Sequence, residues 1–362
     1  MSRRKGLSDE EIEALLFADT DESELEEEDD GWKENSMTEN DNSFAENDDN
    51  FDASISEENE NDATNSEEET QVKWSEIIEN AKIKLNEFNN FAGPMHNLPV
   101  GSTPLNYLKL FLTDEVLEIV RINTNKYAEF CAENRGSADK EWYPIENVKE
   151  IWAYFTILLI MSVNQVPRIS DYWSNSPFLG NEMVKKIMSR NRFTKIKHYF
   201  HLSDREQEKR REDDEFTYTQ KVEPFMTYIK ANFLKHFEPY QRLSIDEALV
   251  KYKGRLGIVQ YMPLKPDKRG IKMWMLCTSQ LGYTLNFDVY SGKNTKMKRS
   301  GKGLGYDVVF HLIECLKKPG HDLYFDRFFT SVDLMIDLNK KGLGACGTGM
   351  PNIKMPAEIK RN

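Results

Sequence analysis

The stretch Arg242–Tyr252 (RLSIDEALVKY) decides the fold that this sequence predicts. Apolar and polar residues alternate along it, which is typical of a β-strand. Two further strands are expected at 273–279 (MWMLCTS) and 284–290 (TLNFDVY), and Gly282 lies in the short turn between them, as in a hairpin. The pattern continues with a helix at 306–316, a strand at 322–326, a helix at 331–341 and a strand at 344–350. This order predicts an α/β domain with a mixed sheet.

The chain upstream of this domain has a mostly helical sequence pattern. Strand signals are few between 105 and 240, and helical spacing of apolar residues begins after Thr113, which we expect to cap a helix. Further helices are expected at 145–164, 180–201 and 218–238. The first 90 residues predict a disordered acidic tail with short helices, since polar and acidic residues dominate and cannot form a core. The expected divisions are therefore 1–90, 91–240 and 241–362.

Charge is distributed unevenly over the 362 residues, whose net charge is −13. Residues 1–100 contain 30 acids against 7 bases, whereas residues 241–362 contain 11 acids against 21 bases. A basic excess confined to one domain predicts a polyanionic partner such as DNA. We also expect that the acidic tail could fold back on this basic region and weaken its binding to DNA.

Composition excludes several classes of protein. The four cysteines are too few for a disulfide framework, and none forms the Cys-x-x-Cys pair of a zinc site. The amino terminus lacks the apolar stretch of a signal peptide. The longest apolar run, Ile151–Val163, is shorter than the roughly 20 residues that span a bilayer, so we interpret it as a buried core helix. We therefore expect an intracellular protein of a reducing compartment, with no membrane contact and no small-molecule cofactor.

Two acids on expected strands, Asp246 and Asp326, form the strongest candidate site. Each has apolar neighbours, and burying an unpaired carboxylate there is unfavourable. A metal ion would relieve that penalty, and Mg²⁺ is commonly held by one or two carboxylates together with substrate phosphates. The alternative is that each acid caps a loop or pairs with a nearby base.

Several blocks of sequence, taken together, resemble the piggyBac family of DNA transposases. The blocks in the last third are 244–255 (SIDEALVKYKGR), 260–274 (QYMPLKPDKRGIKMW) and 324–331 (YFDRFFTS). Those upstream are 91–99 (FAGPMHNLP), 110–128 (LFLTDEVLEIVRINTNKYA), 169–175 (ISDYWSN) and 188–204 (MSRNRFTKIKHYFHLSD). They occur in the family's order and extend over about three quarters of the chain.

The resemblance implies an RNase H-like, retroviral-integrase-like catalytic domain, preceded by a helical dimerisation and DNA-binding domain. It implies a nuclear protein, a homodimer, and DNA cleavage and joining at TTAA sites with three aspartates and Mg²⁺. Asp246 matches the first of these aspartates and Asp326 the second, both as metal ligands.

The family's third aspartate lies farther downstream, on a helix, and we expect it to be missing from residues 1–362, as is the family's cysteine-rich zinc-binding domain. The acids after Asp326 are Asp333, Asp337 and Glu358, and we interpret the first two as a solvated helix face. The expectation is a transposable element-derived, domesticated DNA-binding protein that is inactive alone. The alternatives are a fragment of an active Mg²⁺-dependent transposase and a decaying element without stable function.

Basic residues flank the two aspartates and are the expected DNA contacts. Phosphate contacts of this kind supply most sequence-independent affinity for DNA, which falls steeply with salt. The alternative is an ordinary solvated surface. The residues are Lys251, Lys253, Arg255, Lys265, Lys268, Arg269, Lys272, Lys293, Lys296, Lys298 and Arg299.

Overall fold

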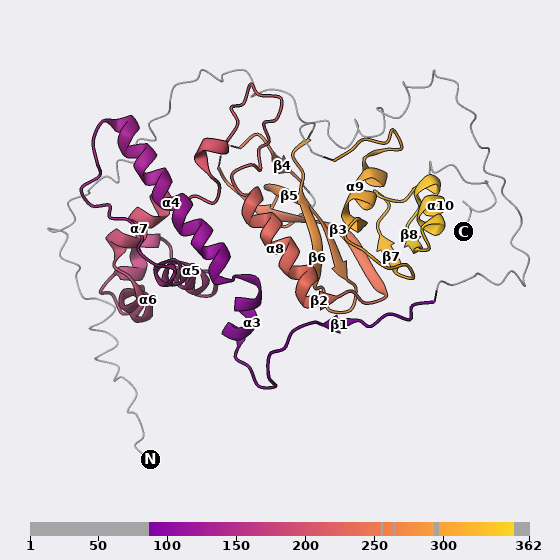
Figure 1. Ribbon diagram of the computed structural model, residues 1–362, viewed down its shortest axis with the longest axis horizontal. Helices are drawn as coiled ribbons and strands as arrows, with labels where there is room; N and C mark the ends of the chain where they lie inside the picture. Colours follow the sequence, from indigo (N-terminus) through magenta and orange to yellow (C-terminus); the bar gives the residue numbers. More distant parts are fainter. Residues whose placement is uncertain (1–86, 255, 264, 293–296, 351–362) are drawn as a thin grey trace, which may run out of the picture. The chain divides into compact units, whose positions relative to one another are not determined.

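The computed structural model of the chain describes residues 87–254, 256–263, 265–292 and 297–350 (Figure 1). All of them belong to one compact unit, Glu69–Asn362. The acidic tail, apart from 87–90, lies outside the described residues, so the disorder and short helices expected there stay predictions.

A mixed sheet of six strands forms the last third of the structure, in the order β4-β5-β3-β7-β8, with β6 paired to the same edge of β5 as β4. The strands β3, β4, β5 and β6 are mutually antiparallel where they pair, whereas β3, β7 and β8 run parallel. The bounds are β3 (Arg242–Lys251), β4 (Val259–Tyr261), β5 (Arg269–Thr278), β6 (Thr284–Val289), β7 (Asp322–Phe325) and β8 (Gly344–Gly347). The α/β class and mixed sheet are thus confirmed.

Alternation along the strands explains which side chains enter the core. Leu243 and Ile245 of β3 are fully buried, and Trp274 and Leu276 of β5 pack in the same cluster. Gly282 adopts a φ of 66° in the turn between β5 and β6, a left-handed conformation that other residues rarely take. The hairpin therefore forms where the sequence predicts it.

Two helices join the strands at the far end of the sheet. Helix α9 (Leu304–Ile313) packs on β5 and β6, and α10 (Val332–Lys340) makes the connection between the parallel strands β7 and β8. The side chain of Ser331 accepts a hydrogen bond from the N–H of Leu334, which caps α10. This crossover fixes the loop that contains Asp326.

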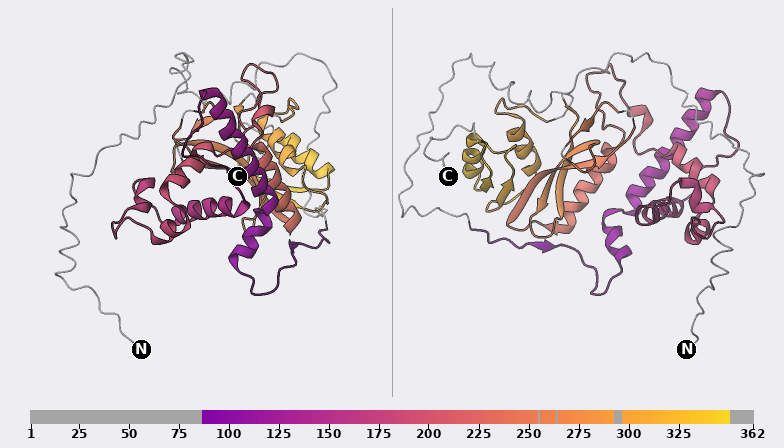
Figure 2. Two further views of the ribbon diagram at one scale, coloured as in Figure 1. Left: turned by 60° about the vertical axis from the view of Figure 1, so that its left-hand side comes forward. Right: turned by 180° about the vertical axis from the view of Figure 1, so that it is seen from behind.

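Helices predominate upstream of the sheet, as predicted. They are α3 (Pro104–Phe111), α4 (Asp114–Arg135), α5 (Val148–Val163), α6 (Glu182–Ile187), α7 (Arg190–Tyr199) and α8 (Glu223–His236), with short 3₁₀ turns η2 (Ile169–Trp173) and η3 (Arg205–Gln207). A short pair of strands, β1 (Gly93–Pro94) and β2 (Phe237–Glu238), links the two ends of this region. Helix α8 lies in front of the sheet in Figure 1, and the strands lie in front of α8 in the view from behind (Figure 2).

Three sequence-based expectations about helices need correction. The helix expected at 180–201 is two helices, because the side chain of Ser189 caps α7 and ends the first helical run. Helix α3 was not predicted, although Thr103 forms a capping box and Pro104 occupies its first turn. Helix α5 is not buried all round, since Val163 is 88% exposed.

The boundary expected at residue 240 stays a prediction, because α8 spans two hydrophobic clusters. Phe225 and Tyr228 pack against the cluster of the upstream helices, while Leu234 packs against the cluster of the sheet. The hydroxyls of Thr113 and Tyr228 lie 2.8 Å apart, and the Asn232 side chain donates to the Phe111 carbonyl. Helix α8 thus ties the start of the helical region to the sheet.

In the part of the chain that the structure describes, no helix is both long enough and apolar enough to cross a membrane.

Candidate functional site

Asp246 and Asp326 lie next to each other because of the pairing between β3 and β7. These strands are parallel, and their last paired residues are Ile245 and Phe325. Asp246 is the next residue of β3 and Asp326 directly follows β7, so the backbone places the two residues side by side at the carboxyl end of β7. The sheet thereby brings together two residues separated by 80 positions in the sequence.

Both aspartates are exposed residues, so the expectation that they are buried among apolar side chains is wrong. Strand β7 ends at Phe325, and Asp326 already belongs to the turn before α10. One oxygen of Asp326 accepts a hydrogen bond from the N–H of Phe328 at 3.0 Å, and one oxygen of Asp246 accepts from the N–H of Glu247 at 2.8 Å. These backbone contacts orient the two exposed carboxylates.

Glu247 and Lys265 form an ion pair of 3.0 Å beside Asp246. This hydrogen bond, with the charges of Glu247 and both aspartates, raises the pKa of Lys265. Burial raises the pKa of Glu247, but its bond to Lys265 and the charge of Lys272 bring the net direction downward. Partial desolvation and the neighbouring charge of Glu247 raise the pKa of Asp246. The two aspartates therefore lie in a cluster of mixed charge.

The Lys272 side chain reaches the same cluster from β5. Its ammonium lies 4.0 Å from the centre of the Trp274 ring and 5.3 Å from that of Phe328. These two rings are themselves stacked, at 5.3 Å and 15°. Desolvation by this burial lowers the pKa of Lys272, although Glu247 and both aspartates act in the opposite direction. Lys272 is thus a half-buried residue of the site.

The aspartate pair fits a divalent cation in part. Among the described residues, no group of three or more His, Cys, Asp or Glu side chains could hold a metal ion. Two adjacent, exposed carboxylates do match the one or two that Mg²⁺ uses when substrate phosphates and water complete its coordination. The pair would hold such an ion with a ligand supplied from outside the described residues.

Comparison of the chain with known proteins identifies its family. The family model described as Transposase IS4 matches residues 103–362, most of the chain. The chain belongs to the piggyBac-type IS4 transposase family.

Human relatives of this transposase-family chain carry the piggyBac name. It is 30% identical over 260 residues to human PiggyBac transposable element-derived protein 3, covering 71% of this chain and 41% of that protein. It is 30% identical over 273 residues to human PiggyBac transposable element-derived protein 2, covering 72% of this chain and 43% of that protein. The chain therefore spans less than half the length of these relatives.

A solved structure with a similar fold is the cryo-EM structure of the piggyBac transposase synaptic complex with hairpin DNA. The similarity has a TM-score of 0.66 and 26% sequence identity, over 75% of this chain and 56% of that one. The mixed α/β architecture of this transposase-family chain is thus that of a transposase solved with DNA.

The structure divides the predicted DNA contacts of this transposase-family chain into groups. Lys251, at the end of β3, pairs with Gly270, so it lies beside the exposed residues Lys268 and Arg269. Lys251 also forms an ion pair of 2.6 Å with Asp267. Lys253 is exposed in the turn after β3, and Lys298 and Arg299 are exposed in the loop before α9. Arg255, Lys293 and Lys296 lie outside the described residues.

Of the acids that follow Asp326, Asp337 has partners of its own. Asp337 accepts hydrogen bonds from Lys302 at 2.7 Å, Lys340 at 2.8 Å and Tyr306 at 3.0 Å, and the hydrogen bond to Lys302 is the main cause that lowers the pKa of Asp337. It is therefore an ion-paired residue rather than a solvated one. Asp333 is exposed on α10, and Glu358 lies outside the described residues.

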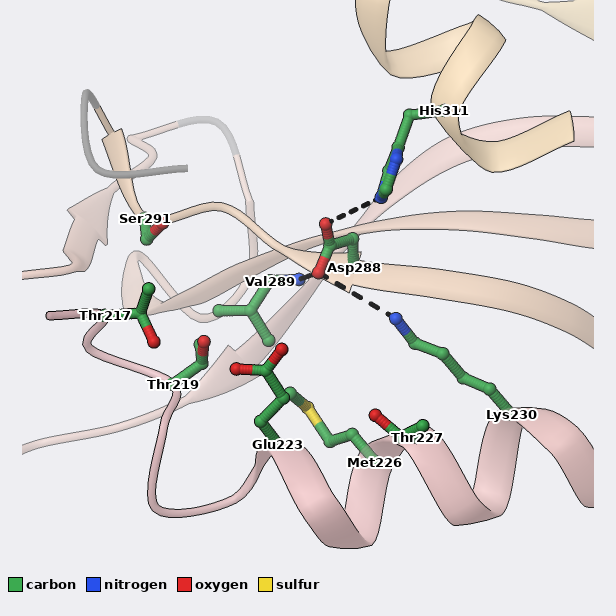
Figure 3. A pocket seen from close by; sticks show the side chains of 10 residues that line it. All are labelled: Thr217, Thr219, Glu223, Met226, Thr227, Lys230, Asp288, Val289, Ser291 and His311. Atoms are coloured by element: carbon green, nitrogen blue, oxygen red, sulfur yellow. Dashed lines mark hydrogen bonds and ion pairs between the residues drawn. The ribbon is translucent and has the colours of Figure 1, made fainter. Parts of the chain in front are cut away.

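A polar pocket lies between α8, β6 and α9 (Figure 3). Asp288 of β6 forms ion pairs with His311 of α9 at 3.0 Å and with Lys230 of α8 at 3.9 Å. The remaining lining residues are Thr217, Thr219, Glu223, Met226, Thr227, Val289 and Ser291. Since Asp288 ties two helices to the edge strand, we interpret this pocket as a structural junction.

The sequence analysis groups Lys272 with the surface bases, although the pattern of β5 indicates that its side chain is partly buried. Lys272, Trp274 and Leu276 alternate along β5, so they face the same side of the sheet. Trp274 and Leu276 are buried. The period of the strand could therefore have assigned Lys272 to a partly buried position.

Proposed function

We propose that this chain binds DNA and holds a divalent cation, Mg²⁺, at Asp246 and Asp326. The observation that supports the proposal is the β3–β7 register, in which the residues just before these two aspartates are paired, on a fold similar to a transposase solved with DNA. We further propose that the sheet is RNase H-like, because Asp246 lies on β3 and Asp326 directly follows the adjacent parallel strand β7. The exposed bases at the ends of β3 and β5 supply contacts to phosphates.

Each group would have a separate task. A bound Mg²⁺ supplies charge stabilisation to an attacking water or 3′-hydroxyl and to a leaving oxygen. Asp246 and Asp326 hold the cation, and the N–H groups of Glu247 and Phe328 hold the carboxylates. Lys251, Lys268 and Arg269 would fix the position of the DNA backbone.

The proposal is that this chain does not complete strand transfer alone. The family chemistry requires a third carboxylate ligand, and among the described residues no group of three or more His, Cys, Asp or Glu side chains could hold a metal ion. The second candidate function is cut-and-paste transposition at TTAA sites by a longer protein. The partial coverage of the relatives favours keeping this candidate.

Manganese binding, followed by electron paramagnetic resonance, tests the metal site. Asp246→Asn and Asp326→Asn should each raise the Kd for Mn²⁺ at least tenfold, which is a loss of about 1.4 kcal/mol or more of binding free energy. Asp333→Asn, which changes an exposed acid on α10, is the matched control and should leave binding unchanged. If all three variants bind Mn²⁺ as tightly as the natural chain, the proposed metal site is wrong.

A cleavage assay separates the two candidate functions. The purified chain is incubated with Mg²⁺ and a plasmid that contains TTAA-flanked transposon ends. Under the first proposal the chain retards DNA in gels and produces no broken or joined strands. Products that disappear in Asp326→Asn would instead establish the transposase.

We also propose that the chain acts in the nucleus as a homodimer, through the helical region 91–240. Exposed apolar side chains on α5, namely Leu159 at 49% and Val163 at 88%, supply a surface that a second copy could cover. Sedimentation equilibrium should give a dimer for the natural chain and a monomer for Leu159→Asp with Val163→Asp. A dimer in both cases would reject this interface.

A further inference from the structure

Among the residues that the structure describes, no group of opposite charge is in direct contact with the Lys272 ammonium. Lys251 and Lys265 each form an ion pair, with Asp267 and with Glu247. No carboxylate or carbonyl oxygen of the described residues accepts a hydrogen bond from Lys272, whose recorded close contacts are with two aromatic rings. A half-buried ammonium with unused donors is unfavourable unless another group supplies an acceptor.

Phe328 connects Lys272 to the aspartate pair. Its ring lies under the ammonium, while its N–H donates to the Asp326 carboxylate at 3.0 Å. The ammonium also lies 4.0 Å from the centre of the Trp274 ring, which is stacked on the Phe328 ring. The two rings restrict the ammonium at a place where the charge of Asp326 still acts on it, so less conformational entropy is left to lose when it binds an anion.

We propose that Lys272 binds a phosphate oxygen of the nucleic-acid strand that lies against Asp246 and Asp326. This inference rests on the proposed function and assigns one side chain within it. A phosphodiester brings the acceptor oxygens and the negative charge that Lys272 lacks, and it also completes the coordination of a cation held by two carboxylates. The lowered pKa of Lys272 agrees with an ammonium that gains by contact with an anion.

This role differs from that of the exposed bases. Lys268 and Arg269 are exposed, so they would contact phosphates whether or not a metal is bound. A phosphate that reaches Lys272 lies at the aspartate pair, where a cation reduces its repulsion from Asp246 and Asp326. Lys272 should therefore contribute to the part of DNA affinity that depends on the divalent cation.

Fluorescence anisotropy with a short duplex oligonucleotide of random sequence tests the proposal on the full chain. Affinity is measured with EDTA and with Ca²⁺, which replaces Mg²⁺ without supporting cleavage. In Lys272→Met the gain in affinity on adding Ca²⁺ should fall about tenfold, the size of one charge-assisted hydrogen bond. Lys272→Arg, which keeps the charge over the rings, should restore most of the gain.

Lys341→Met is the matched control. Lys341 lies over the Phe310 ring at 5.2 Å, but it precedes β8 and so lies toward the opposite end of β7 from Asp326. Its removal should leave the Ca²⁺-dependent gain unchanged. Thermal unfolding of each variant verifies that it is folded.

The outcomes separate this inference from the proposed function. An unchanged Ca²⁺-dependent gain in Lys272→Met overturns the role of Lys272 and leaves DNA binding intact. A natural chain without affinity for the duplex overturns both. If Lys272→Met does not fold, ¹³C-methylation of the lysines replaces it, with Lys272→Arg used to assign the resonance. A Lys272 resonance that does not move when duplex and Ca²⁺ are added then contradicts the proposal.

Discussion

Arg192 carries a buried positive charge, and Glu150 is the acidic residue that pairs with it. Its guanidinium donates to both oxygens of Glu150 at 2.6 and 2.9 Å and to the Tyr143 carbonyl at 2.8 Å. The Arg192 side chain is 5% exposed, so little water can replace a lost partner. Glu150→Gln should therefore lower the free energy of unfolding by about 3 kcal/mol, because it leaves an uncompensated buried charge. Urea denaturation measures the loss.

Glu182→Gln provides the comparison at this scale. Glu182 also pairs with a base, Lys185 at 2.9 Å, but its side chain is 75% exposed. Exposed pairs contribute about 0 to 1 kcal/mol, so this variant should unfold close to the natural chain. Similar losses for Glu150→Gln and Glu182→Gln would show that burial does not decide the strength of the Arg192 contact.

At the scale of elements, Asp288 joins the edge strand β6 to α8 and α9 through Lys230 and His311 (Figure 3). The hydrogen bond to Asp288 raises the pKa of His311, against the effect of its burial. Burial raises the pKa of Asp288, but His311 and Lys230 bring the net direction downward. Glu314, 3.9 Å from His311, adds to the rise, while the charge of Lys230 opposes it.

The signs of these shifts predict a pH window for the junction. Because the folded pKa of His311 is above its unfolded value of about 6.5, its contribution is complete below that pH and is lost as pH rises through the folded pKa. The contribution of Asp288 is present above about pH 4 and is lost on acidification. The natural chain should exceed His311→Gln in stability by roughly 1 kcal/mol near pH 5.5 and by less at pH 8.5. Urea titrations that give a pH-independent difference would contradict this.

The elements also show how far the sequence predicts the structure. The sequence predicts the strands β3, β5, β6, β7 and β8, and the prediction of β3 rests on the period of two that burial on one side of a sheet imposes. Strand β4 has three residues, too few to show any period. Helix α3 was missed because Pro104 reads as part of a linker, although proline is favoured in the first turn of a helix.

The candidate site was predictable to a different degree. The resemblance identified the two aspartates, whereas their proximity depends on the parallel pairing of β3 and β7, which local patterns do not contain. The stacking of Lys272 on Phe328 depends in addition on the turn after β7. Contacts between segments distant in the sequence are thus the part that required the structure.

At the scale of the whole molecule, charge predicts how the acidic segment affects DNA binding. Residues 1–70 contain 27 acids and 4 bases, a net charge of −23, so deleting them changes the net charge of the chain from −13 to +10. A polyanionic segment tethered to the basic residues of the sheet competes with DNA phosphates for them, and salt screens both interactions. The deletion should therefore raise DNA affinity strongly at low salt and only slightly at high salt.

Fluorescence anisotropy at two salt concentrations measures this effect, and a chain in which the acids of 1–70 are replaced by Asn and Gln is the matched control. The replacement keeps the length and bulk of the segment, so it separates charge from obstruction. If charge is the cause, the replaced chain binds as tightly as the deletion variant. Affinity that stays at the natural level in both variants at low salt would show that the segment does not reach the basic residues, and the negative net charge would then be without influence on DNA binding.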